Sequence, residues 1–259
     1  MLSAFLIWRR AYQKDQIHPP QTESLLVTLQ SLSAIFTLTG IILLQPIHDH
    51  EINFTLSEAA ATATLFVQVM YLVGLIRHGI QGLGLFLLPV TAIPLLLAPF
   101  LPIDATTEPI YTSSVLQTGH LLISMIAYAV LTMAAFHAIM LLLLDKALKR
   151  KHTHPILQFM PPLMKLETLM ITFLRWSVWL LLLSILTGLV WQWVDFSKFA
   201  LFNHKVLLSL FSFALLSWLL SQQKKGTWHG RRTGQLILLS YILMLLAYFG
   251  VHLIQAWLH

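Results

Sequence analysis

The chain has 259 residues, of which 57% are hydrophobic and only 10% are charged. Soluble domains carry about one quarter charged residues, so this chain lacks the polar side chains that would cover a water-facing surface. Its formal net charge of +6 would suggest a nucleic-acid partner in a soluble protein, but the charges are arranged as in a membrane protein. The chain contains no cysteine, which excludes disulfides and thiolate metal sites.

An apolar segment, Met1–Trp8, opens the chain and is followed at once by Arg9 and Arg10. It is too short to span a bilayer, and no small-residue cleavage site follows it. We expect either an interfacial anchor or the remainder of a first helix, which would raise the number of spans from seven to eight. We therefore divide the chain into an N-terminal stub with a cytoplasmic segment, residues 1–23, and a transmembrane domain, residues 24–259.

Seven long apolar blocks follow in the transmembrane domain. They are Ser24–Leu44, Ala59–Ile76, Gly82–Leu101, Val115–Leu144, Trp176–Val194, Val206–Ser221 and Gln235–Leu258. Most reach the roughly 20 residues that cross about 30 Å of hydrocarbon, and lipid offers no partner to an unpaired backbone amide. The sequence therefore predicts an all-α, polytopic transmembrane helix bundle. Between the fourth and fifth blocks, His154–Glu167 contains paired prolines and is predicted to lie along the cytoplasmic membrane surface.

Basic residues alternate between the two sides of this predicted bundle. Fourteen of the sixteen Lys and Arg residues fall in Met1–Glu23, Arg77–Gln81, Asp145–Arg175 and Gln222–Gly234. The segments on the other side contain two, Lys198 and Lys205. Cytoplasmic loops carry the excess of Lys and Arg, so we expect a bacterial inner-membrane protein with a cytoplasmic N-terminus and a periplasmic C-terminus.

Two histidines are predicted to lie just below the periplasmic surface on different helices. His120 lies about one and a half turns into its block, and His204 opens the Val206 block from the same side. Ionisable side chains are costly inside a membrane, so each is a functional candidate. Two imidazoles at one height could bind opposite faces of a haem iron. Alternatively, each could cap a helix end or form a hydrogen bond to a neighbouring helix.

The other histidines give weaker signals. His137 lies seventeen residues after His120, roughly 25 Å along a helix, so we expect it to be a packing residue nearer the cytoplasm. His252 could join the periplasmic pair. His48-Asp49-His50-Glu51 could bind a divalent metal, although such alternation is also common in loops without a metal.

Several functional classes do not fit this sequence. No apolar block contains an aspartate and no H-E-x-x-H pattern occurs, which disfavours an intramembrane protease. We find no internal repeat and few charges at depth, which disfavours ion-coupled transport. The residues themselves imply no catalytic step, so we do not expect an enzyme.

A series of short motifs carries a family resemblance. They are Met160–Glu167 (MPPLMKLE), Thr187–Leu189 (TGL), Asn203–Ser209 (NHKVLLS), Gly226–Arg232 (GTWHGRR), Leu246–Gly250 (LAYFG), and Gly119–Leu121 followed by Ala127–Ala129. In their order and spacing they resemble the YpjD/HemX-like branch of the cytochrome c assembly (CcsA-type) membrane proteins. The similarity runs from about Glu51 to the C-terminus. The tryptophan-rich motif of true CcsA proteins is not present. Trp191–Asp195 is at most a remnant of it, and the alternative is an aromatic belt at the membrane interface.

The resemblance implies haem handling, because CcsA-type proteins carry haem or present it at the outer face for attachment to apocytochrome c. His120 and His204 occupy family histidine positions and would be axial ligands of haem b. Tyr128, Lys205 and Trp191 would contact the macrocycle or its propionates. Haem, the lipid bilayer and other cytochrome c maturation or membrane proteins are the expected partners. The alternative is a cofactor-free membrane scaffold, an accessory subunit or regulator of another membrane protein.

Overall fold

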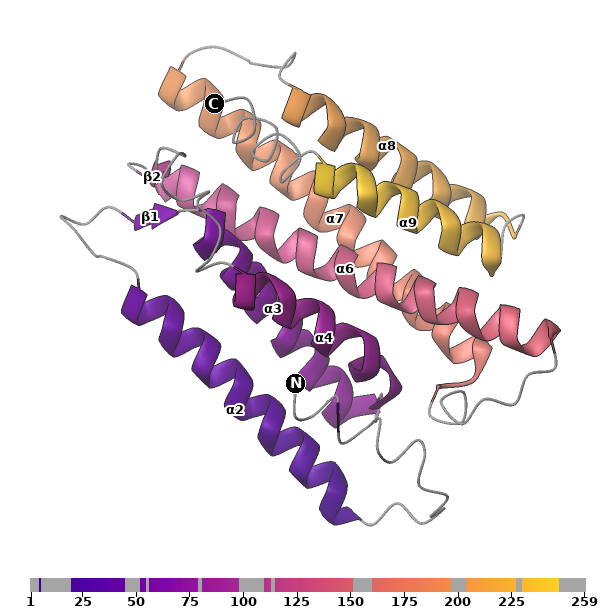
Figure 1. Cartoon of the computed structure of the whole chain (residues 1–259). Helices are drawn as coiled ribbons and strands as arrows, with labels where there is room; N and C mark the ends of the chain where they lie inside the picture. The colour runs from indigo at the N-terminus through magenta and orange to yellow at the C-terminus, as the bar shows by residue number, and fades with distance from the viewer. Residues whose placement is uncertain are drawn as a thin grey trace.

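The computed structural model describes residues 5, 20–44, 52–54, 56–78, 81–97, 110–112, 115–150, 160–196, 204–226 and 230–246. The helices among them are α2 (Pro20–Leu44), α3 (Leu56–His78), α4 (Gln81–Leu97), α6 (Val115–Lys149), α7 (Leu163–Phe196), α8 (His204–Lys224) and α9 (Arg231–Leu245), shown in Figure 1. Each of the predicted apolar blocks overlaps one of these helices, so the helical prediction is confirmed for the residues that the structure describes.

Four helices contain stretches long and apolar enough to cross a membrane. These stretches are Ser24–Ile42, Val115–Lys149, Leu163–Val194 and Val206–Lys224. A shorter apolar stretch, Ala61–Arg77, lies in α3. The chain is therefore a helical membrane protein, and a total of seven crossings remains a prediction.

A short β-ribbon, which the sequence analysis did not predict, joins two of the connections between helices. Strand β1 (Ile52–Phe54) pairs antiparallel with β2 (Ile110–Thr112). The ribbon ties the α2–α3 connection to the α4–α6 connection, and β2 also contacts α6 near its first residues (Figure 1). Each strand has only three residues, too few for alternation of polar and apolar side chains to be recognised in a sequence.

The four helices α6 to α9 form the part of the bundle that positions the predicted site. Helix α6 packs along α7 and against α9, and α8 packs against the same two helices. Helices α6 and α8 are therefore diagonal to each other, with α7 and α9 between them. Helices α3 and α4 cover another side of α6, and α2 packs on the outside of α3 (Figure 1).

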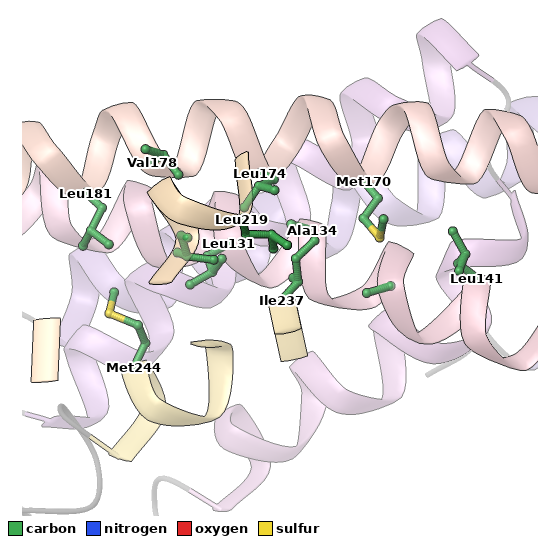
Figure 2. Packing of buried hydrophobic residues seen from close by; sticks show 12 residues of the cluster. Leu131, Ala134, Leu141, Met170, Leu174, Val178, Leu181, Leu219, Ile237 and Met244 are labelled. Carbon is green, nitrogen blue, oxygen red and sulfur yellow. The ribbon is translucent and has the colours of Figure 1, made fainter. Parts of the chain in front are cut away.

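Small residues on α6 allow this close packing. In lipid, helices associate through van der Waals contact rather than through the hydrophobic effect, so small side chains at the interface are favourable. The fully buried alanines of α6 are Ala127, Ala129, Ala134, Ala135 and Ala138. A Cβ added to Gly234 of α9 would lie 3.6 Å from the Ala138 Cβ, an ordinary van der Waals contact. Figure 2 shows the resulting core, where Ala134 meets larger side chains that include Leu174, Leu219 and Ile237.

His137 belongs to this packed interior. Its side chain is 0% exposed and its ring lies 5.1 Å from that of Phe173. The Nδ1–H group donates to the Met133 carbonyl oxygen, 2.7 Å away in the same helix. This burial agrees with the packing role that we expected for His137.

The last five residues of the predicted surface segment His154–Glu167 are helical. Leu163–Glu167 belong to α7, and the Lys165 and Leu166 amides donate to the Pro162 carbonyl oxygen at 2.9 and 3.1 Å. Proline favours the start of a helix because its missing N–H needs no partner there. The Gly230 amide donates to Glu167 Oε1 at 2.8 Å, so two of the family-like motifs meet here.

We expect Ala138→Leu to destabilise the bundle by about 1–3 kcal/mol, because the larger side chain would overpack the α6–α9 contact. Ala214 of α8 is exposed, so Ala214→Leu is the matched control and should change little. Denaturant unfolding in detergent micelles measures both. Equal stability of the two variants would contradict the close packing of Ala138.

Candidate functional site

His120 lies in the second turn of α6, and its imidazole ring packs against α7. The ring nitrogen Nδ1 is 2.9 Å from the Ser184 carbonyl oxygen. A carbonyl oxygen can only accept, so Nδ1 carries the proton. In the neutral ring, Nε2 then holds the lone pair that could bind a metal.

Thr187 supports the same assignment. Its hydroxyl donates within α7 to the carbonyl oxygens of Leu183 and Ser184, at 2.9 and 3.0 Å. With its proton used there, the Thr187 oxygen can only accept from His120 Nδ1, 3.3 Å away. Two acceptors on α7 therefore face the same ring nitrogen.

Three residues of α7 form a surface against which the imidazole rests, and we call Ser184, Gly188 and Trp191 the α7 seat. Their spacing of four and three residues places them on one face of the helix. Trp191 stacks on the His120 ring with centroids 6.1 Å apart and an angle of 18° between the planes. At Gly188, an added Cβ would lie 2.8 Å from His120 Cε1. The ring therefore lies directly over the glycine.

A pair of hydroxyl groups lies beside the ring. The Ser124 hydroxyl donates to the His120 carbonyl oxygen at 2.7 Å. Ser124 Oγ is also 2.7 Å from Ser184 Oγ. Because the proton of Ser124 is already used, Ser184 donates to Ser124. This bond joins α6 to α7 one helical turn after His120.

The other predicted site residues either lie farther along the bundle or have side chains that the structure does not describe. Tyr128 is partly buried against the α6–α9 core, eight residues or about 12 Å along α6 from His120. His204 and Lys205 are the first residues of α8, and their side chains lie outside the described residues. The positions of His252 and of His48–Glu51 also lie outside them.

The sequence analysis did not name Ser184, Thr187 or Gly188 as site residues. Thr187 and Gly188 stand in the TGL motif, so a signal was present without an assigned role. Ser184 gave no signal of its own, because its contact with His120 is made by the backbone carbonyl, which any residue type carries.

Sequence comparison with known proteins supports the family resemblance that the motifs indicated. Residues 24–259 match the family model described as cytochrome C assembly protein. The chain is 33% identical over 176 residues to the inner membrane protein YpjD of Escherichia coli K12, covering 66% of this chain and 65% of that protein. It is 31% identical over 152 residues to the protein HemX of Brevibacillus brevis, covering 59% of this chain and 55% of HemX.

A third relative is an uncharacterised 28.8 kDa protein of Azospirillum brasilense, 34% identical over 132 residues. That match covers 51% of this chain and 49% of the relative. The chain thus spans between about half and two thirds of the length of these curated relatives.

We expect Ser184→Ala to destabilise the protein by about 1 kcal/mol, because it removes one hydrogen bond between helices in the membrane. The backbone bond from His120 to residue 184 would remain. Ser177→Ala is the matched control, since the buried Ser177 hydroxyl donates within α7 itself, to the Leu174 carbonyl oxygen at 2.8 Å. Unfolding of both variants in micelles measures the difference, and an unchanged Ser184→Ala protein would argue against the hydroxyl pair.

Proposed function

The chain belongs to the cytochrome C assembly protein family, and from this premise we propose that it binds haem b through His120 and His204. In this proposal it presents or conveys haem near the periplasmic face during cytochrome c biogenesis. No catalytic step is assigned to its residues.

The observation that carries the proposal is the arrangement of the His120 ring. Histidines that bind metals usually donate their second ring N–H to a carbonyl or carboxylate, which fixes the tautomer and the ring orientation. His120 donates through Nδ1 to the Ser184 carbonyl oxygen at 2.9 Å. The side chain therefore fits an axial ligand that binds through Nε2.

The helix arrangement supports a pair formed with His204. Leu174 of α7 and Leu219 of α8 belong to the same core cluster and lie close together in Figure 2. From Leu174 to Gly188 the α7 axis rises about 21 Å, and from Leu219 to His204 the α8 axis rises about 22 Å in the same direction. The first residue of α8 thus starts near the height of the α7 seat, on the helix diagonal to α6.

If haem bound there, His120 and His204 would hold its iron, and its propionates would need cationic partners. Lys205 follows His204 directly and would pair with a propionate. Trp191 holds the His120 ring by stacking, and it and Tyr128 would contact the macrocycle. These roles extend the family resemblance to individual residues of this chain.

We also propose the orientation that the basic residues predict, with the N-terminus in the cytoplasm and the C-terminus in the periplasm of a bacterial inner membrane. The relative from Escherichia coli is named an inner membrane protein. In this orientation the α6 start, the α7 end and the α8 start face the periplasm together.

A cofactor-free scaffold is the second candidate, and one observation favours it. The hydrogen bond from His120 to the Ser184 carbonyl oxygen joins α6 to α7 and would stabilise the bundle without any ligand. In that case the protein would act as an accessory subunit or regulator of another membrane protein.

Absorption spectroscopy separates the two candidates. We expect protein purified in mild detergent, after growth with excess haem precursor, to show a Soret band that a His120→Ala, His204→Ala double variant lacks. His137→Leu is the control, because His137 is buried elsewhere in the bundle and should leave the band unchanged. Colourless wild-type protein would favour the scaffold.

We expect Lys205→Glu to weaken haem binding about tenfold or more, because a charge-assisted hydrogen bond to a propionate would be lost. Lys198→Glu makes the same charge change in the same predicted periplasmic connection and should bind haem normally. Titration of purified apoprotein with haemin gives both dissociation constants. Equal weakening of the two variants would point to a general charge effect instead of a propionate contact.

A further inference from the structure

We propose that Gly188 is a positioning residue for His120, because a side chain at residue 188 would displace the imidazole and redirect Nε2. The part of this inference that concerns haem rests on the proposed function. The contact between the two residues does not, so it can be tested on protein that contains no haem.

The space above Gly188 is taken by the imidazole ring. A Cβ at residue 188 would lie 2.8 Å from Cε1, 3.2 Å from Nδ1 and 3.3 Å from Nε2 of His120. The first distance is shorter than real Cβ atoms show, so an alanine would require the ring or the helix to shift. Gly119, the residue before His120, provides a contrast, since nothing lies within 4 Å of a Cβ added there.

The imidazole cannot move away without losing its contacts. Nδ1 is held by the Ser184 carbonyl oxygen at 2.9 Å, and one ring face stacks on Trp191. Because the added methyl group would approach the edge that carries both nitrogens, moving the ring would lengthen the Nδ1 hydrogen bond. It would also change the direction of the lone pair on Nε2, and Nε2 is the atom proposed to bind iron.

Glycine is otherwise unfavourable at this position. It lies inside α7, where alanine is the better helix former. Its conformation is helical, so no positive φ angle requires glycine here. The lack of a side chain at residue 188 is therefore explained by the room it leaves for the His120 ring.

A double-mutant cycle tests the contact without haem. In the wild-type background we expect Gly188→Ala to lower the unfolding midpoint, because the methyl group meets the ring. In the His120→Ala background the ring is gone, and the same change should be neutral or stabilising. Gly119→Ala should behave alike in both backgrounds. The Gly188→Ala protein could also fail to fold. If adding His120→Ala then restores folding, this result supports the contact equally.

The result that overturns the inference is equally specific. If Gly188→Ala has the same effect with and without His120, including a failure to fold in both backgrounds, then the ring is not what the added methyl group meets. This outcome is independent of whether the protein binds haem.

A second measurement tests the orientation of Nε2. For protein loaded with haem, we expect Gly188→Ala to shift the low-spin electron paramagnetic resonance signal. It should also speed haem loss to apomyoglobin by about ten- to hundredfold, the range typical of residues that orient a metal ligand. Gly119→Ala should match wild type in both. If the resonance signal and the rate of haem loss are unchanged in Gly188→Ala, the positioning role is refuted. Colourless wild-type protein would instead refute the proposed function, and the double-mutant cycle would then decide whether the contact exists.

Discussion

The hydrogen bond from His120 Nδ1–H to the Ser184 carbonyl oxygen is the interaction on which the account of the site depends. It joins α6 to α7, fixes the tautomer of the ring and leaves Nε2 as the atom with a free lone pair. Stacking on Trp191 and the missing side chain of Gly188 hold the same ring in place. One contact thus serves both the packing of the bundle and the chemistry proposed for it.

Such an arrangement is reasonable inside a membrane. Lipid cannot satisfy a buried imidazole, so a partner within the protein is needed. A backbone carbonyl meets this need whatever side chain residue 184 carries, and the Ser124–Ser184 hydroxyl pair adds a second bond between the same helices. Packing of small residues, such as Ala138 of α6 against Gly234 of α9, brings a further helix into close contact with α6.

Much of the fold followed from hydrophobicity alone, because a span must be apolar over its whole length. Each predicted block is helical over the residues that the structure describes, and His120 and His137 lie seventeen residues apart on one helix, as expected. The β-ribbon and the start of α7 at Leu163 were missed, since three-residue strands and mixed polar segments carry no periodic signal. The partner of His120 could not be predicted either, because it is a backbone atom and depends on the register between two helices.

In the proposed function, His120 binds iron through Nε2 together with a second imidazole. Electron paramagnetic resonance of ferric protein carrying ¹⁵N-labelled histidine tests it most directly. We expect a low-spin signal coupled to two imidazole nitrogens, with one coupling lost in His120→Ala. A high-spin signal, a single imidazole coupling that survives in His120→Ala, or protein that takes up no haem would contradict it.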